Sequence, residues 1–484
     1  MSNFVGWASA HRSIPRGLKP TLLLVAALVS ACAAPGGASH QTPSLELPSG
    51  SAQPAVAADW WKSFNDEPLN ALVDEALRNN RDLARAMARI DESRAALRSA
   101  RADRFPTVSA GTSATRQRVS ENGTTPLFGA SPIFNDYRAS LKVGYEVDLW
   151  SRAANLTAAA RSELLAGEYA RDTLRTALAA QVVQSYATLQ SLDAQYKLYG
   201  ESVQAQRDSL KLQRLRFDSG DISELDIRQL DAELITNESQ LPKIDRARGE
   251  AERALALVLG RSPRALIEQG VARGAAPVVA GSGLPEGLPS DLLQRRPDVL
   301  AAEARLRAAG ARVDAARAAY FPSISLTAEL GRESTALSQL TDAPSLIWGV
   351  VASLTQPIWN AGRIAASNDA AKARELQAEL DYRDSVAGAF KEARDALGAY
   401  SETRVSLQSA AQRAQALERA AELTRLRYNG GEASRLDVIN AERLSLNARA
   451  QSADAQRALA AAQADVYRAF GGGWAAPEQR AQIK

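Results

Sequence analysis

The stretch YRASLKVGYEVDLW, residues Tyr137 to Trp150, decides the fold class. Its odd positions carry Tyr137, Ala139, Leu141, Val143, Tyr145, Val147 and Leu149, and its even positions carry Arg138, Ser140, Lys142, Gly144, Glu146 and Asp148. This alternation predicts a β-strand with one apolar and one charged face. Most of the remaining chain is rich in Ala, Leu, Arg and Glu and reads as helix. A mainly helical protein must therefore provide an environment for the apolar face of a strand.

Composition removes several classes of function. The chain has 484 residues, a formal charge of +3 and 45% hydrophobic residues, so no strong charge points to nucleic acid. Its two histidines, His11 and His40, lie near the N-terminus, and Cys32 is its single cysteine. A zinc site, a Cys/His nucleophile or a Ser-His-Asp triad would need such residues in the folded body. We therefore expect no metal, no cofactor, no catalytic residues and no nucleic-acid partner.

An enzyme of the cell envelope that uses paired carboxylates is an alternative. The Asp and Glu residues fall at charge-pair spacing with Arg on helix faces, and no Gly-rich phosphate loop is present. The sequence therefore predicts that the protein is not an enzyme.

The N-terminus carries an export signal. His11, Arg12, Arg16 and Lys19 precede the apolar run TLLLVAALV, and the small-residue site VSAC follows, ending at Cys32. This is the order of a signal peptide, which we place at residues 1–31. The site resembles a bacterial lipobox, which implies lipidation of Cys32; an ordinary signal peptide with an incidental cysteine is the alternative. Residues 32–58 are rich in Ala, Gly, Ser and Pro and are interpreted as a tether.

An internal repeat organises the rest of the chain. DLARAMARIDESRAALRSARADRFPTVS, from Asp82, is echoed by DVLAAEARLRAAGARVDAARAAYFPSIS, from Asp298. The match is closest between RLRFDSGDISELD (Arg214–Asp226) and RLRYNGGEASRLD (Arg425–Asp437). We place the first repeat at 59–260, a linker at 261–296, the second repeat at 297–470 and a C-terminal tail at 471–484.

Each repeat is predicted to contain a strand pair and a long helical hairpin. The strand pairs span 105–149 (Phe105–Thr115 with Tyr137–Leu149) and 321–356 (Phe321–Leu330 with Leu346–Gln356), joined by loops at Arg116–Asp136 and Arg332–Ser345. The hairpins span 151–260 and 361–470, with first helices at Ser151–Phe217 and Ala361–Tyr428. Gly220 and the pair Gly430–Gly431 supply the turns. The returning helices are expected to run to about Leu259 and Phe470.

The apolar faces of these strands are expected to meet lipid. A strand of about 14 residues tilted near 45° covers roughly 30 Å, the thickness of a hydrocarbon core. A soluble sandwich also has alternating strands, but it would show many strands with turns every 8–12 residues. Since about eight strands are needed to close a barrel, four strands must be pooled with those of other copies of the chain.

The repeat, the duplicated turn, the lipobox and LPSDLLQRRPDVLAAEARLRAA (Leu288–Ala309) together resemble the outer membrane factors of Gram-negative bacteria. The resemblance implies a mainly α protein with a membrane β part. Three copies would form a helical barrel of long antiparallel hairpins and a 12-stranded transmembrane β-barrel. Within PSDLLQRRPDV, Ser290 or Asp291 is expected to cap a helix and Pro297 to open the next one.

The resemblance also implies a role. Such a homotrimer is the exit channel of a tripartite efflux system for drugs and toxic compounds, lipid-anchored in the outer membrane and extending into the periplasm. Its partners would be a periplasmic adaptor (membrane fusion) protein, an inner-membrane transporter of the resistance-nodulation-division type, and outer-membrane lipid. The alternatives are the duct of a type I protein secretion system and a non-channel periplasmic coiled-coil lipoprotein that acts as a spacer.

Candidate gate residues are transferred by position from the family. Asp226 and Asp437 would lie at the periplasmic constriction, where acidic side chains ring the pore. Glu224 of the first turn corresponds to Arg435 of the second, and opposite charges there could latch the closed state. The chain has Asn440 where a second acidic residue is common, so the constriction should be less negative. The alternative is that the two aspartates only cap helices.

Candidate adaptor-docking residues lie in the same two turns. They are Arg216, Phe217 and Gly220 in the first turn and Arg427, Tyr428 and Gly431 in the second. Their assignment follows from the resemblance, which places the adaptor at the hairpin tips.

Overall fold

The protein is described from a computed structural model that covers residues 57–120, 122, 131–274 and 296–472. These residues divide into two compact units. The strand-bearing unit contains residues 99–159 and 309–374, and the helical unit contains residues 57–98, 160–274, 296–308 and 375–472. Each unit therefore draws residues from both sequence repeats.

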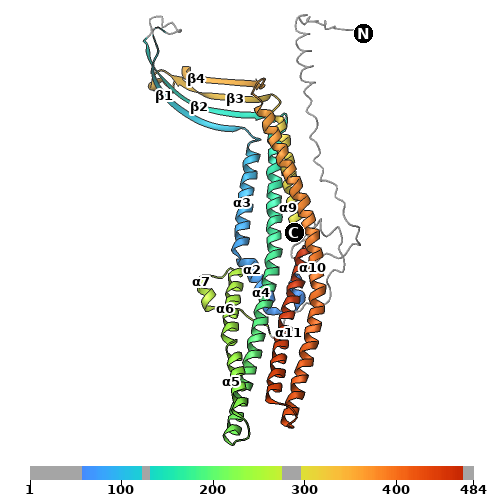
Figure 1. The fold of residues 1–484 in the computed structure, drawn as a ribbon. Helices are drawn as coiled ribbons and strands as arrows, with labels where there is room; N and C mark the ends of the chain where they lie inside the picture. The colour runs from blue at the N-terminus through green and yellow to red at the C-terminus, as the bar shows by residue number, and fades with distance from the viewer. Residues whose placement is uncertain (1–56, 121, 123–130, 275–295, 473–484) are drawn as a thin grey trace, which may run out of the picture. The chain divides into compact units, whose positions relative to one another are not determined.

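The strand-bearing unit is built on one antiparallel sheet in the order β1-β2-β3-β4, whose strands lie side by side in Figure 1. The strands are β1 (Thr107–Arg118), β2 (Ile133–Val147), β3 (Ser323–Ser334) and β4 (Leu346–Thr355). Short 3-10 turns, η2 (Leu337–Gln339) and η3 (Ala343–Ser345), lie between β3 and β4. The predicted strand pairs are confirmed. The predicted loops were too long, because β1 continues to Arg118, β2 begins at Ile133 and β3 continues to Ser334.

The register keeps like residues on one face. Leu141 lies opposite Ala110 on one side and Leu330 on the other, and Lys142 lies opposite Ser109 and Glu329. Because side chains alternate across a strand, this register collects apolar residues on one face and charged residues on the other.

The helical unit is made of long antiparallel helices. Its elements, some of which extend into residues assigned to the other unit, are η1 (Trp60–Phe64), α2 (Glu67–Asn79), α3 (Arg81–Ala102), α4 (Arg152–Asp218), α5 (Glu224–Glu238), α6 (Leu241–Val258), α7 (Pro263–Glu268), α9 (Pro297–Ala318), α10 (Arg363–Asn429) and α11 (Arg435–Ala469). Both α4 and α10 contain 67 residues, as the repeat predicts. Among the described residues, none of the helices is both long and apolar enough to span a bilayer.

Two details of the hairpins differ from the prediction. The first returning helix is broken into α5 and α6 around Ser239 and Gln240, because Pro242 lies in the first turn of α6 and cannot donate a helical hydrogen bond. The helix α10 begins at Arg363 rather than Ala361, because Ala361 and Gly362 both have positive φ. Pro297 opens α9, as predicted.

The core of the helical unit forms where small and aromatic residues meet. Trp60 stacks on Tyr467 with ring centroids 4.7 Å apart, and Tyr186 is fully buried beside them in the same cluster. Tyr186 donates to Asp66, and burial raises the pKa of its phenol to about 12. A second cluster joins α9, α10 and α11, and a third joins the hairpins through Leu210, Leu230 and Ile439.

Candidate functional site

The two hairpin turns have the same backbone design. In each, a glycine with positive φ ends the long helix: Gly220 at +84° and Gly431 at +80°. The residue after the glycine donates back to the helix, Asp221 to Arg216 and Glu432 to Arg427, both at 2.8 Å. These are Schellman turns, which satisfy the last carbonyl groups of a helix. Of the predicted turn glycines, Gly220 and Gly431 are therefore the residues that permit each turn, and Gly430 has no positive φ.

Asp226 and Asp437 both close a capping box. Asp437 accepts from the backbone N–H of Ser434 at 2.9 Å, and the Ser434 hydroxyl accepts from the N–H of Asp437 at 3.2 Å. Ser223 and Asp226 repeat this arrangement at the start of α5. The hydrogen bonds from the Ser434 hydroxyl and N–H, with Arg427 nearby, lower the pKa of Asp437 below its ordinary value. Helix capping accounts for both aspartates within one chain.

Glu224 and Arg435, which begin the returning helices α5 and α11, do not pair with each other. Arg435 donates to the Ser209 hydroxyl on α4 at 2.8 Å and lies over the Tyr428 ring, 5.4 Å from its centroid. Glu224 instead pairs with Arg228, one turn along α5, at 3.1 Å. The predicted pairing of Glu224 with Arg435 is thus absent within the described chain, and Arg435 ties the second hairpin to the first. The amide of Asn440 accepts from Arg443 at 3.1 Å.

The other tip residues face outward. Phe217 is exposed, and the Arg216 side chain is exposed beside it. Arg427 is exposed and lies 3.7 Å from Glu432. Sequence reasoning missed two apolar pairs in equivalent positions of the turns: Leu215 with Leu426, and Leu225 with Leu436. All four are exposed. Their repetition in both turn motifs was the signal that could have identified them.

Sequence reasoning also missed a repeated ion pair that closes each hairpin. Arg214 reaches Asp231 across the first hairpin at 3.5 Å, and Arg425 contacts Glu442 across the second, with its Nε 3.2 Å from the carboxylate. The pairs occupy equivalent positions in the repeats, so each tip is held in the same way. Exposed pairs of this kind add little stability by themselves.

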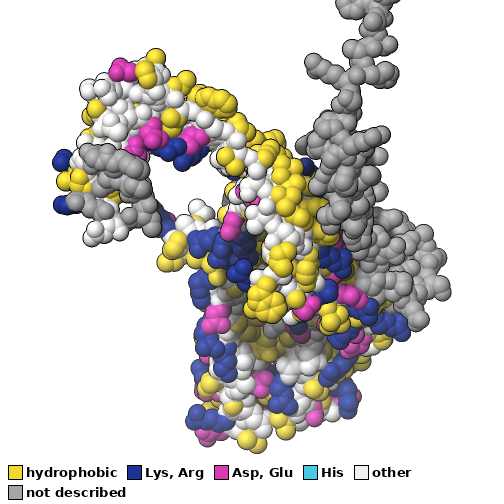
Figure 2. Space-filling view, turned by 90° about the horizontal axis from the view of Figure 1, so that it is seen from above, with side chains coloured by type: hydrophobic (Ala, Val, Ile, Leu, Met, Phe, Trp, Pro, Cys, Tyr) yellow, Lys and Arg dark blue, Asp and Glu magenta, His cyan; other side chains and the backbone are white. Residues whose placement is uncertain are grey.

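The charged face of the sheet is held together by ion pairs. Arg138 on β2 lies 2.7 Å from Glu329 and 3.3 Å from Glu333 on β3, and Lys142 lies 3.8 Å from Glu329. In Figure 2 hydrophobic side chains cover the outer side of the arc formed by the sheet, and Lys, Arg, Asp and Glu gather on its inner side. Trp348 and Val350 belong to the apolar face, and their side chains are 75% and 71% exposed. Such a surface suits lipid on one side and water on the other.

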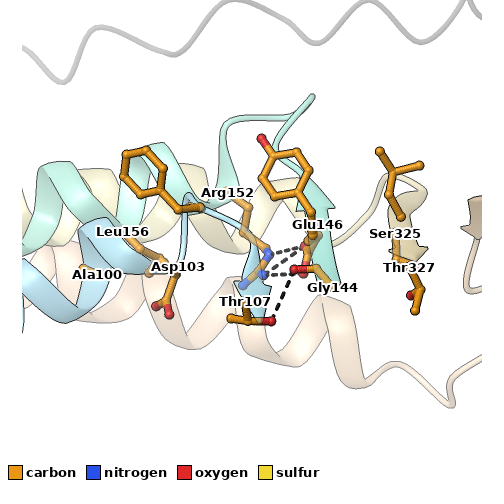
Figure 3. Close-up of a pocket in the computed structure, with 13 residues that line it drawn as sticks. Ala100, Asp103, Thr107, Gly144, Glu146, Arg152, Leu156, Ser325 and Thr327 are labelled. Atoms are coloured by element: carbon orange, nitrogen blue, oxygen red, sulfur yellow. Dashed lines mark hydrogen bonds and ion pairs between the residues drawn. The ribbon is translucent and has the colours of Figure 1, made fainter. Parts of the chain in front are cut away.

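A polar pocket of about 360 Å³ continues the charged face at the end of the sheet (Figure 3). Arg152 makes a two-pronged contact with Glu146, with its Nη2 2.9 and 3.0 Å from the two carboxylate oxygens. Thr107 donates to the Gly144 carbonyl at 3.2 Å. Ser325 and Thr327 complete the polar wall. No group of three or more His, Cys, Asp or Glu side chains that could hold a metal ion occurs in the part of the chain that the structure describes.

The motif PSDLLQRRPDV lies mostly outside the described residues, as does Cys32. Its described end carries a buried arginine. Arg296 donates to Asp298 at 2.8 Å, to Glu392 on α10 at 2.6 Å and to the Ala469 carbonyl at the end of α11 at 2.6 Å. Burial opposes its charge, yet the two carboxylates raise its pKa above the ordinary value. This arginine joins α9, α10 and α11, which supports a structural role for the motif.

The two-faced sheet and the paired helical hairpins define a class of protein. Its members combine long antiparallel helical hairpins with an antiparallel sheet that is apolar on one face and charged on the other. Comparison with known proteins is consistent with this. The model of the outer membrane efflux protein family matches residues 72–261 and 288–472. The chain is 35% identical to "Probable efflux pump outer membrane protein TtgC" of Pseudomonas putida over 88% of each chain. It is 31% identical to "Probable outer membrane lipoprotein SilC" of Salmonella typhimurium, over 86% of this chain and 88% of that one.

Solved structures agree. The crystal structure of the Campylobacter jejuni CmeC outer membrane channel matches with a TM-score of 0.85 and 26% identity, over 91% of this chain and 97% of that one. The chain therefore belongs to the outer membrane efflux protein family. It is an efflux protein of the outer membrane, and the mainly helical fold with a small antiparallel sheet is confirmed.

Proposed function

We propose that three copies of the chain form the exit channel of a tripartite efflux system that passes small molecules through the outer membrane. The observation that carries this proposal is the four-stranded sheet, which is apolar on one face and charged on the other. Its edge strands β1 and β4 each have one side without a strand partner among the described residues. Unpaired edges are not tolerated in lipid, so neighbouring copies must complete the wall.

The charged face would then line a water-filled lumen, where Arg138, Lys142, Glu329 and Glu333 are solvated. A duct of this kind moves solutes without chemistry, so we infer that the protein is not an enzyme. The substrates would be selected by the inner-membrane transporter, and a periplasmic adaptor would connect the two proteins. The relative TtgC is named as an efflux pump protein, which favours efflux over protein secretion.

The experiment is to purify the protein, measure its mass in detergent and record currents in planar bilayers. A mass of three chains and discrete conductance steps are expected. A monomer, or bilayers that stay silent at all voltages and salt concentrations, would contradict the proposal.

We infer that the hairpin turns form the gate. Three copies of Asp226 and Asp437 around one axis would attract cations, and the contact of Arg435 with Ser209 would help to hold the hairpins in the closed position. Asn440 and Glu224 would lie beside this ring. Replacing Asp437 with Ala should change conductance and cation preference. Unchanged currents would remove Asp437 from the gate and leave it with its capping role alone.

We infer that the adaptor docks at the exposed tips. Arg216, Phe217, Gly220, Arg427, Tyr428 and Gly431 belong to the two Schellman turns, and the exposed leucines nearby offer apolar contacts. Arg427→Glu should weaken capture of the adaptor in a pulldown, with Arg383→Glu, outside the turns on α10, as the control. Equal capture by both variants would count against the assignment.

We also propose that Cys32 is lipidated and anchors the chain to the outer membrane. A Cys32→Ser variant should lose incorporation of labelled palmitate. Labelling equal to that of the unchanged protein would show that the lipid is attached elsewhere.

A further inference from the structure

One contact joins the two repeats at the end of the sheet. Trp150 stacks on Phe321 with ring centroids 4.6 Å apart and planes at 19°, and its indole N–H donates to the Pro322 carbonyl at 2.7 Å. The β2–β3 ladder ends at the pair Val147 and Ile324. Trp150 lies three residues beyond Val147 and Phe321 three residues before Ile324, so the stack continues the register of the ladder. It marks the register of β2 on β3.

Each repeat also contains one counterpart of this contact for which no ring partner occurs among the described residues. Phe105 and Pro106 precede β1 as Phe321 and Pro322 precede β3, and Trp359 follows β4 as Trp150 follows β2. Trp359 is 88% exposed and Phe105 is 67% exposed. They stand at β4 and β1, the two edges of the sheet. Both aromatic side chains are therefore available to a neighbouring copy that pairs at these edges.

We propose that Trp359 of one protomer stacks on Phe105 of the neighbouring copy and donates its indole N–H to the Pro106 carbonyl there. This contact sets the register between β4 and the neighbour's β1, with Ser353 opposite Gly111. The inference rests on the proposed function, because it requires copies to assemble edge to edge, and it adds the residues and the register of the interface.

Two features of the strands agree with this register. All 10 residues of β4 then lie opposite β1 residues, from Leu346 opposite Arg118 to Thr355 opposite Ser109. Apolar residues stay on one face, since Leu354 meets Ala110 and Val350 meets Ala114. A shift by one residue would put the apolar face of one strand against the polar face of the other.

A rival register differs by two residues. Three residues separate Trp359 from α10, whereas one separates Trp150 from α4. Aligning the repeats on their helices rather than on the tryptophans would place Ser353 opposite Ser113. Leu346 would then lie opposite Ser120, beyond the end of β1, and Val350 would meet Arg116.

The tilt of the strands also separates the two registers. In a barrel of 12 strands, the proposed register gives a strand tilt of about 46° to the barrel axis and the rival register gives about 54°. Strands in barrels typically tilt by about 35–45°, so the proposed register fits better.

Engineered cysteine pairs distinguish the two registers. Gly111→Cys with Ser353→Cys, and Thr112→Cys with Ala352→Cys, place one pair on each face. Antiparallel neighbours alternate between closer and wider spacing, so one of the pairs has the better geometry for a disulfide. A side chain at Gly111 meets nothing within 4 Å. The matched controls for the rival register are Ser113→Cys with Ser353→Cys and Ala114→Cys with Ala352→Cys.

The full-length protein in membranes is oxidised and run on gels without reductant. We expect at least one of the two proposed pairs to give covalent dimers and trimers that disappear on reduction, and the controls to give several-fold less. Stronger bands from the controls, or none from any pair in a protein that still has the mass of three chains, would overturn the register while the channel proposal stands. A monomeric mass would defeat both proposals.

The stack itself is tested by dissociation of the assembly in detergent. Trp359→Ala and Phe105→Ala should each speed dissociation by about 2- to 12-fold, as expected for an aromatic pair, and the double variant should add little to either. Trp359→Phe should dissociate more slowly than Trp359→Ala, because its ring can still stack. Trp348→Ala, on the apolar face of β4, is the control. Additive effects of the two changes, or none, would show that these residues do not touch.

Discussion

At the scale of single residues, one motif explains much of the hairpin tips. Ser-x-x-Asp begins the returning helix in both repeats, and both copies form the full capping box. The serine and aspartate satisfy N–H groups that the first helical turn leaves unpaired. Any role of these aspartates in the gate is therefore additional to a structural role that each copy already performs.

The capping box predicts a pH dependence. Because the pKa of Asp437 is lowered from its ordinary 3.8, its contribution to stability is present above that value and is lost as pH falls through the lower, folded value. Amides at the start of α11 should therefore exchange faster in Asp437→Ala than in the unchanged protein at pH 5, measured by hydrogen exchange with mass spectrometry. The difference should shrink as pH falls below 3.8 and vanish once pH is below the lower, folded value. Asp454→Ala, in the middle of α11, should leave these amides unchanged at both pH values, and a difference that persists at low pH would contradict the prediction.

Arg296 provides a second prediction for a single residue. Its side chain is 8% exposed and it bonds two carboxylates and a helix-end carbonyl. Replacing it with Ala removes the cation beside Asp298 and leaves Glu392 with Arg468 alone, at a cost of roughly 2 kcal/mol, below the about 3–5 kcal/mol for fully buried pairs because both carboxylates keep contact with water. The melting temperature in detergent should fall by several degrees. Arg307→Ala, at an exposed position on α9, the helix that follows Arg296, should change it little, and equal effects would refute the buried network.

At the scale of elements, the hairpins show how a repeat diverges within one fold. The two long helices have equal length, while the first returning helix is broken near Pro242 and the second runs unbroken as α11. The break follows from one residue that cannot donate a backbone hydrogen bond. The turn before each returning helix is the same, since the glycine with positive φ and the capping box are kept.

Adjacent glycines in the second turn give a matched test. Gly431 has a φ of +80°, a left-handed conformation that costs a residue with a side chain about 1–2 kcal/mol, whereas Gly430 has no positive φ. We expect Gly431→Ala to speed hydrogen exchange around the turn by about 5- to 30-fold and Gly430→Ala to have little effect. The same exchange in both variants would show that the turn does not depend on the left-handed residue.

At the scale of the whole molecule, the sheet has a different requirement from the helical core. Its apolar face is exposed in the single chain, and its charged face is satisfied by cross-strand ion pairs. Neither face can be buried by the four strands alone. Stability of this part therefore depends on surroundings that a single copy does not contain, which is the physical reason for proposing assembly.

The charged face yields a prediction for ion flow. Arg138→Glu replaces the cation between Glu329 and Glu333 with a third carboxylate, so the lumen becomes more negative and should favour cations more strongly. The measurement is the reversal potential across a bilayer in a KCl gradient. Arg264→Glu, an exposed residue on α7 outside the sheet, is the control of equal charge change. A reversal potential that Arg138→Glu leaves unchanged would place this face away from the pore.

Much of the fold was predictable because its signals are local. Strand alternation, helix length and turn glycines depend on a few neighbouring residues, and each of these features occurs in both sequence repeats. The contacts of Arg435 with Ser209, 226 residues apart, and of Trp150 with Pro322, 172 residues apart, were not predictable. No pattern of spacing indicates which of many arginines reaches which hydroxyl once long helices pack together.

The sequence by itself determined the two-faced strands, the two hairpins of equal length and the capped turns, because periodicity and capping act over one or two turns of chain. Only the tertiary structure decided that Arg435 ties one hairpin to the other and that Arg296 joins three helices. It also decided that Trp150 stacks on Phe321 while Trp359 is exposed. These facts depend on where separate helices and strands meet. That position is set by packing and register over the whole chain, which no local stretch of residues specifies.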